Sequence, residues 1–87
     1  MDIFCETLLR LKTKKEIKNF LKDLLNRQER AMLVRRLLIA EMLVKDYTYK
    51  EIVNRLHCGT ATIARIDRWL NFGRGGYKQA VKVRELK

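Results

Sequence analysis

Residues 48–70 read TYKEIVNRLHCGTATIARIDRWL, and this stretch decides the fold. It contains two short segments with apolar residues at helical spacing, joined by the three-residue turn His57-Cys58-Gly59. Thr48 opens the first segment with a capping box, because its side chain can accept from the backbone N–H of Glu51 while the Glu51 carboxylate reaches back. Two short helices joined by a tight turn form a helix-turn-helix, so we predict this motif here.

The residues of this motif divide between an inner and an outer face. The inner face, which would hold the two helices at a steep angle, is apolar: Ile52, Leu56, Cys58, Ile63 and Ile66. The outer face of the second helix carries Thr60, Thr62, Arg65 and Arg68 together with the small residues Ala61 and Ala64. Small residues let a helix lie deep in a groove, so the outer face is predicted to meet the major groove of DNA. Thr60 is also expected to cap this helix. His57 stands where such a turn usually has glycine, so a positive φ is expected there.

Two further capping signals divide the rest of the chain. Thr13-Lys14-Lys15-Glu16 repeats the capping box, and Asn26-Arg27-Gln28-Glu29 is a close variant of it. Proline is absent, so helix can extend through nearly the whole chain. The third helix is apolar around most of its circumference, and we expect neighbours, including a partner subunit, to enclose it. The pattern predicts an all-α protein of about six helices, at residues 2–11, 14–24, 27–45, 49–56, 61–70 and 76–86.

Charge and size narrow the functional classes. The chain has 20 basic and 10 acidic residues in 87, a net charge of +10 that attracts polyanions such as nucleic acid. A chain of this length forms one domain and buries too little surface to be comfortably stable alone, which favours a homodimer. Within it we expect residues 1–46 to form mainly the dimerisation core, residues 48–70 the helix-turn-helix and residues 76–87 a C-terminal helix.

A membrane partner is not expected. No uninterrupted apolar run is longer than Leu37–Ala40, which is far shorter than a bilayer span, and the N-terminus lacks the pattern of a signal peptide. Cys5 and Cys58 fit reduced thiols. We therefore expect a cytoplasmic, nucleoid-associated protein.

Other residues around the motif suit phosphate. Tyr49, Lys50 and Asn54 lie on the first helix, and Arg74 and Lys78 lie in and beside the segment Gly73-Arg74-Gly75-Gly76. This segment either offers backbone N–H groups to an anion at the start of the last helix or is a plain flexible corner. The aromatic residues mostly fall on apolar stripes and are expected in the core, which leaves no exposed platform for single-stranded RNA.

Catalytic and metal chemistry have little support in the sequence. His57 and Cys58 are neighbours in the chain, a poor geometry for a nucleophile and its base, and the Cys and His residues are too few for a zinc site. An enzyme and a cofactor are not expected. Two alternatives to a sequence-specific DNA reader stay open: a helical dimeric protein–protein adaptor whose basic face meets an acidic partner, and a non-specific nucleoid-binding protein.

Residues 24–78 resemble the Trp repressor family, and especially its YerC/YecD branch of Trp repressor-like proteins. The matching landmarks are Leu24-Leu25-Asn26-Arg27-Gln28-Glu29, Arg36, Thr48-Tyr49-Lys50-Glu51-Ile52, Thr62-Ile63-Ala64-Arg65-Ile66 and Leu70-Asn71-Phe72-Gly73-Arg74-Gly75-Gly76-Tyr77. The resemblance implies an intertwined homodimer that acts as a transcriptional repressor, with two reading helices about 34–36 Å apart in successive major grooves. It also implies DNA contacts at Lys50, Thr60, Ala61 and Ala64.

The resemblance also indicates the position of an effector site. In the family's founding member two arginines sandwich the corepressor tryptophan, and the corresponding positions here carry Arg36 and Arg65. Ile66 stands where that pocket has glycine, and Trp69 stands where it has a small serine. Both residues add bulk where the amino acid would lie, and the Trp69 ring can itself occupy the apolar slot. These four residues are therefore interpreted as the remnant of an effector site that does not bind tryptophan.

Overall fold

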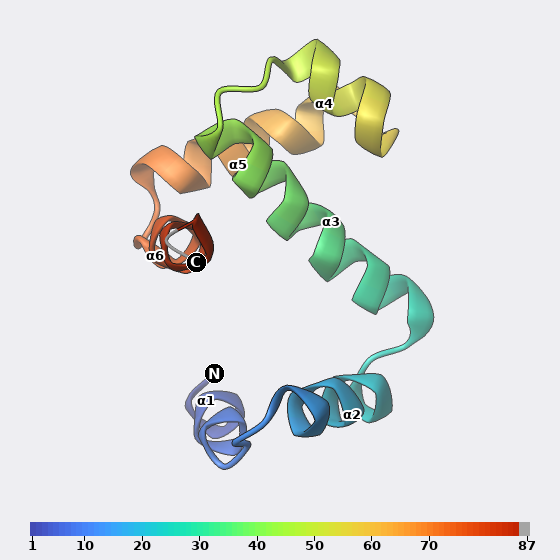
Figure 1. Ribbon diagram of the computed structural model, residues 1–87, viewed down its shortest axis with the longest axis vertical. Coiled ribbons are helices and arrows are strands. Elements are labelled where there is room, and N and C mark those ends of the chain that lie inside the picture. The colour runs from blue at the N-terminus through green and yellow to red at the C-terminus, as the bar shows by residue number, and fades with distance from the viewer. Residues whose placement is uncertain (86–87) are drawn as a thin grey trace. The chain divides into compact units, whose positions relative to one another are not determined.

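All regular structure in the described part of the chain is helical (Figure 1). This computed structural model describes residues 1–85, with side chains described for residues 1–81. The six helices are α1 (Asp2–Leu9), α2 (Lys14–Leu24), α3 (Arg27–Val44), α4 (Tyr49–Leu56), α5 (Thr60–Phe72) and α6 (Gly76–Glu85). The predicted all-α fold of six helices is confirmed. None of these helices is both long enough and apolar enough to cross a bilayer.

The predicted helix bounds agree with the structure to within about two residues. Helices α2 and α4 begin and end as predicted. Helix α1 ends at Leu9 and α3 at Val44, slightly earlier than predicted, whereas α5 begins one residue earlier and continues to Phe72. Leu86, which was predicted to lie in the last helix, is outside the described residues.

Reciprocal side-chain caps explain where three of the helices begin. Thr13 Oγ1 accepts from the backbone N–H of Glu16, and Glu16 Oε1 accepts from the N–H of Thr13, both at 3.1 Å. Thr48 and Glu51 make the same pair of hydrogen bonds at 3.2 and 2.9 Å. Asn26 and Glu29 make it too, at 2.9 Å in both directions. Each pair satisfies otherwise unpaired N–H groups and places a carboxylate at the positive end of a helix. All three predicted capping signals are confirmed.

The chain divides into two compact units, Met1–Met32 and Leu33–Lys87. The first unit holds α1, α2 and the beginning of α3. Its aromatic contact is between Phe4 and Phe20, whose ring centroids lie 6.4 Å apart at an interplanar angle of 30°. No side chain of residues 1–32 is buried. The apolar faces of the first unit therefore remain largely uncovered.

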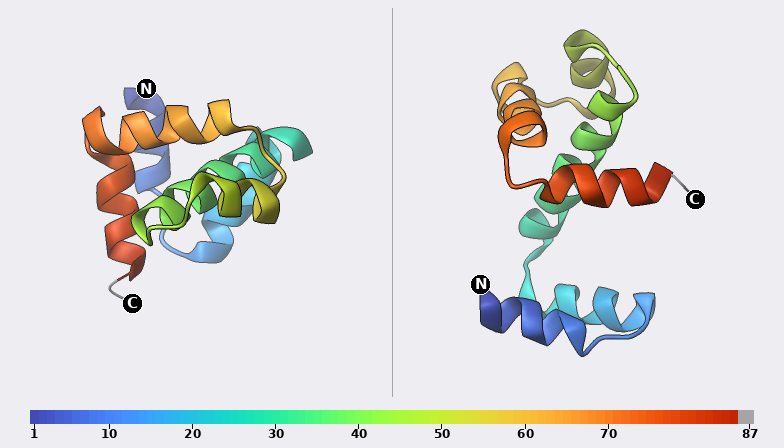
Figure 2. Two further views of the ribbon diagram at one scale, coloured as in Figure 1. Left: turned by 90° about the horizontal axis from the view of Figure 1, so that it is seen from above. Right: turned by 90° about the vertical axis from the view of Figure 1, so that its left-hand side faces the viewer.

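The second unit has a well-defined core. Its fully buried members come from α3, α4, α5 and α6, and each is at most 2% exposed: Ile39, Ala40, Ile52, Ile63, Ile66 and Val81. Burying one such isoleucine stabilises the fold by roughly 1.5–3 kcal/mol relative to leaving it exposed. Figure 2 shows the sharp turn that leads from the end of α5 into α6. This core includes three residues of the predicted inner face of the helix-turn-helix, so it sets how α4 and α5 pack.

Helix α3 is less covered than the sequence predicts. Met32, Leu33, Val34, Leu37 and Leu38 are 38–55% exposed, so the expected enclosure of this helix is not found within one chain.

The aromatic residues Phe72 and Trp69, both expected in the core, are 85% and 51% exposed, and that expectation is wrong for both. The physical reason is helical geometry, since Phe72 lies two residues after the buried Leu70 and therefore about 200° around the helix from it.

Candidate DNA-binding surface

Helices α4 and α5 form the predicted helix-turn-helix. Ile52 of α4 and Ile63 and Ile66 of α5 are buried in one cluster, with Leu56 and Cys58 packed against it. The turn begins after α4 with His57, whose φ is 54° and ψ 42°, and its N–H donates to the carbonyl of Val53 at 2.8 Å. The positive φ expected at His57 is confirmed. Histidine is among the residues that adopt this left-handed conformation most readily after glycine.

Gly59, and not Thr60, is the N-cap of α5. Gly59 has an extended backbone, with φ −80° and ψ 155°, and no side chain caps the helix. Its carbonyl accepts from the N–H of Ile63 at 3.4 Å. The predicted cap at Thr60 is therefore wrong, because Thr60 is already the first residue inside the helix. Its hydroxyl is exposed at the end of α5 that carries unsatisfied N–H groups.

The residues predicted to face DNA are all exposed. On α5 they are Thr60, Ala61, Thr62, Ala64, Arg65 and Arg68; on α4 they are Tyr49, Lys50 and Asn54; Arg74 and Lys78 lie at the start of α6 or just before it. Among residues 1–81 the one ion pair joins Lys45 Nζ to Glu41 Oε1 at 3.2 Å. The guanidinium groups of Arg65 and Arg68 are therefore not neutralised by a carboxylate of the described chain.

Tyr49 belongs to a polar network that links α4 to α5. Its hydroxyl donates to Asp67 Oδ2 at 2.7 Å, and Asn71 Nδ2 donates to Asp67 Oδ1 and to the Asp67 carbonyl, both at 2.8 Å. The hydrogen bond to the Asp67 carboxylate raises the pKa of Tyr49 above its ordinary value of 10.0. Since the phenolic proton is directed at Asp67, Tyr49 positions the motif in this structure and does not offer its proton to phosphate. Asp67 and Asn71 were missed in the sequence because no local pattern marks a contact across 18 residues.

The glycine segment closes α5 and opens α6. Gly73 ends α5, and its N–H donates to the carbonyl of Trp69 at 2.9 Å. A Cβ at Gly73 would collide with that same carbonyl oxygen. Gly75 has φ +87°, and its carbonyl accepts from the N–H of Gln79 at 2.9 Å. The backbone geometry therefore explains why both positions are glycine. Arg74, which lies between them in the sequence, is exposed.

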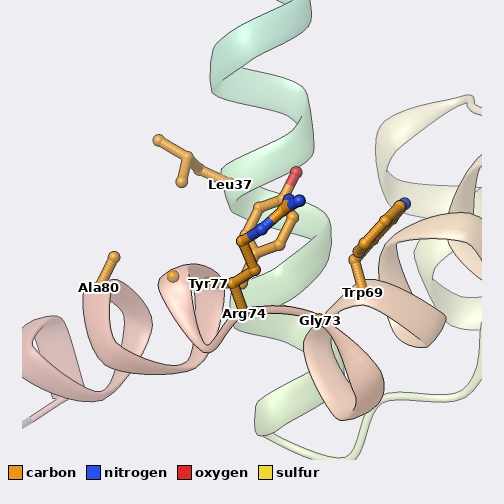
Figure 3. A pocket seen from close by; sticks show the side chains of 7 residues that line it. Leu37, Trp69, Gly73, Arg74, Tyr77 and Ala80 are labelled. Carbon is orange, nitrogen blue, oxygen red and sulfur yellow. The ribbon is translucent and has the colours of Figure 1, made fainter. Parts of the chain in front are cut away.

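The four residues interpreted as an effector-site remnant line one cavity. Arg36, Arg65, Ile66 and Trp69, together with Tyr77 of α6, surround about 320 Å³. A second cavity of about 400 Å³ shares Trp69 and Tyr77 and extends along α6 to Ala80 (Figure 3). Ile66 is 2% exposed and Trp69 is 51% exposed. The isoleucine and the indole therefore stand at the same cavity as the two guanidinium groups.

The fold and this surface define a class of protein, an all-helical helix-turn-helix protein with an exposed basic second helix. The family model described as Trp repressor protein matches residues 1–85. The protein YerC of Bacillus subtilis (strain 168) is 36% identical over 81 residues, which cover 93% of this chain and 78% of YerC. The chain belongs to the Trp repressor family, a family of helical DNA-binding regulators.

Solved structures agree with this assignment. The crystal structure of a TrpR-like protein from Eubacterium eligens ATCC 27750 matches with a TM-score of 0.89 and 31% identity, covering 97% of this chain and 87% of that protein. A crystal structure from Staphylococcus aureus also matches with a TM-score of 0.89, at 30% identity over 99% of this chain and 86% of the other. The resemblance seen in the sequence to the Trp repressor family and its YerC branch is thus confirmed.

Proposed function

We propose that the protein is a sequence-specific transcriptional repressor that reads the major groove of duplex DNA as a homodimer, without tryptophan as corepressor. The observation that carries the proposal is the two-sided character of α5. One side of this helix, with Ile63, Ile66 and Leu70, is buried, while the other side presents Arg65 and Arg68 to solvent without an ion pair in the described chain. Arginine is the residue that most often reads guanine in the major groove.

The uncovered apolar surface supports the homodimer. Large apolar residues of α3 are exposed, and no side chain of residues 1–32 is buried. Exposed apolar residues of this kind are typical of an interaction surface. A second copy of the chain would cover this surface. A dimer also presents two reading helices, which matches the two-fold symmetry of palindromic operators.

The cavity beside α5 supports independence from tryptophan. Ile66 and Trp69 line it, and both are larger than the glycine and serine of the family's founding member. Their bulk reduces the room for an indole between Arg36 and Arg65. Repression would then follow from occupancy of the operator, in the cytoplasm and on the nucleoid, under control of the protein's own concentration.

Selection of binding sites from random duplex DNA tests the proposal. The expected result is an enriched palindrome whose half-sites lie about one helical turn apart. On that duplex Arg65→Ala weakens binding by about 1–3 kcal/mol, as expected for a lost base-edge contact. The matched control is Arg10→Ala, which removes an exposed arginine at the end of α1. Equal affinity of the wild type and a folded Arg65→Ala variant would remove Arg65 from the reading surface.

The same titration tests the role of tryptophan. Millimolar tryptophan is expected to leave both the melting temperature and the affinity for the selected duplex unchanged. A thermal shift would show that the cavity accepts the amino acid despite Ile66 and Trp69. No enriched sequence, together with weak salt-sensitive binding to every duplex, would favour a non-specific nucleoid protein or an adaptor for an acidic partner.

A further inference from the structure

Helix α2 carries a second positively charged surface, which the helix-turn-helix does not use. Its four exposed lysines, which we call the lysine stripe, are Lys14, Lys15, Lys18 and Lys22. At about 100° per residue, these side chains fall within about 100° of the helix circumference. The apolar residues of α2 occupy a separate arc, and its two acidic residues, Glu16 and Asp23, lie on the far side of the stripe. The stripe is therefore a continuous surface of one charge.

No group of the described chain neutralises the lysine stripe. The one ion pair among residues 1–81 lies elsewhere, between Lys45 and Glu41. Two carboxylates are adjacent to the stripe in sequence. Glu16 is engaged by the backbone, since it accepts from the N–H of Lys12 at 2.7 Å and from that of Thr13, and Asp23 forms no ion pair within residues 1–81. Like charges at i, i+4 spacing, as in Lys14, Lys18 and Lys22, destabilise a helix. An external polyanion would relieve this repulsion.

We propose that the lysine stripe binds the phosphate backbone of duplex DNA, outside the bases read by α5. The proposal rests on DNA being the partner in the proposed function and adds a second contact surface to it. From Lys14 to Lys22 the stripe extends about 12 Å at 1.5 Å per residue. Duplex DNA carries one phosphate per about 1.7 Å of its axis, so several phosphates lie within reach. Lysine is a compact charge on a flexible stem, which suits phosphates and does not select bases.

The same residues disfavour a protein or a membrane as the partner. Lysine is depleted in protein–protein interfaces, and no apolar residue interrupts the stripe to anchor such a contact. A membrane would require the apolar arc of α2, which in the proposed homodimer is covered by the second copy of the chain, and Phe20 in that arc already stacks against Phe4 of α1. Glu16 and Asp23 would also bring negative charge to an anionic lipid surface.

A salt titration with a charge-matched pair of variants tests the lysine stripe. Lys14→Gln/Lys18→Gln removes two charges from the stripe, and Arg10→Gln/Arg27→Gln removes two from exposed positions outside α2. The dissociation constant is measured against salt on the selected duplex and on an unrelated duplex, with circular dichroism as the check on helix content. The stripe variant is expected to reduce the slope of log K against log salt by about 3.6, because the proposed homodimer loses four phosphate contacts, two from each subunit, and each contributes about 0.9.

The ratio of affinities for the two duplexes separates this proposal from the proposed function. The stripe variant weakens binding to both duplexes alike and so leaves the ratio unchanged, whereas the control pair leaves the slope at its wild-type value. A wild-type slope in the stripe variant, with sequence preference intact, would overturn the stripe and keep the proposed function. A reduced slope in the stripe variant of a protein that shows no sequence preference would keep the lysine stripe and overturn the proposed function. Binding to phosphatidylglycerol vesicles that the stripe variant loses, with its DNA slope unchanged, would overturn the proposal in favour of a membrane surface.

Discussion

Tyr49 and Asp67 join the two helices of the motif through one hydrogen bond of 2.7 Å, and Asn71 donates to the same carboxylate. Tyr49 is 36% exposed, so water competes for both groups and the bond contributes as an ordinary hydrogen bond and not as a buried one. Its main contribution is to fix the position of α4 relative to α5, because it joins the first turn of α4 to the middle of α5. Residues that read DNA depend on that relative placement.

Replacing Tyr49 by phenylalanine removes this bond and little else. Tyr49→Phe is expected to lower the free energy of unfolding by about 0.5–1.5 kcal/mol, because the Asp67 carboxylate loses the hydroxyl donor while the ring is kept. Urea denaturation measures the difference. The control is Tyr77→Phe, since the Tyr77 hydroxyl has no hydrogen bond within the described residues. Equal losses in the two variants would contradict a specific role for the Tyr49 hydroxyl.

The capping carboxylate of Glu51 makes part of the stability depend on pH. Its pKa is lowered from the ordinary 4.5, first because it accepts from the backbone N–H of Thr48. A lowered pKa in the folded protein means that ionised Glu51 favours folding. This contribution is present above the ordinary pKa and is lost as pH falls through the folded value.

Thermal melts of Glu51→Gln test this dependence. The wild type is expected to be more stable at neutral pH, and the difference in melting temperature should shrink between about pH 6 and about pH 3. Glu6→Gln is the control, because the Glu6 side chain accepts no hydrogen bond in the described chain. A difference that stays constant with pH would show that the Glu51 charge does not stabilise α4.

At the scale of the elements, the helix starts could be predicted because capping is local. Thr13, Asn26 and Thr48 each meet a glutamate three residues later, so a few residues determine where the helix begins. The start of α5 lacks such a partner, and there the prediction failed by choosing Thr60 over Gly59. The inner apolar face was predicted for the same local reason, since its spacing follows the helix period.

The connection between α5 and α6 offers a test of backbone conformation. Gly75→Ala is expected to destabilise the protein by about 1–2 kcal/mol, because a Cβ disfavours φ +87°. Gly76→Ala is the matched control, since Gly76 has ordinary φ and nothing lies within 4 Å of its added Cβ. As the first residue of α6, it should instead be neutral or stabilising by up to about 1 kcal/mol. Chemical denaturation measures the free energy of unfolding of both variants. Equal changes in the two would contradict the argument from the φ of Gly75.

At the scale of the whole molecule, the sequence predicted the fold better than it predicted exposure. Apolar periodicity shows which residues are expected to be buried, but it does not show whether their own chain or another one buries them. Helix α3 was therefore predicted to be enclosed, although its apolar residues are exposed in one copy of the chain. Arg36 and Arg65 could be placed at one cavity only through family resemblance, because that cavity lies between elements far apart in sequence. Asp67 could not be found at all, since its role depends on how α4 crosses α5.

The proposed homodimer gives a prediction about mass. The wild type is expected to sediment as a dimer and to melt at a temperature that rises with protein concentration. Val34→Glu places a charge on the exposed apolar surface of α3 and should yield a monomer. Gln28→Glu adds the same charge to an exposed polar position of that helix and should leave the dimer intact. A Val34→Glu variant with the wild-type mass would place the dimer contact elsewhere.

The lack of any buried side chain in residues 1–32 has a consequence for biosynthesis. This unit leaves the ribosome before the second unit, and its helices of 8 and 11 residues are too short to persist alone in water. The emerging segment therefore stays open to chaperones and proteases until another chain covers it. In the proposed homodimer, maturation of the protein therefore waits for a second copy of the chain.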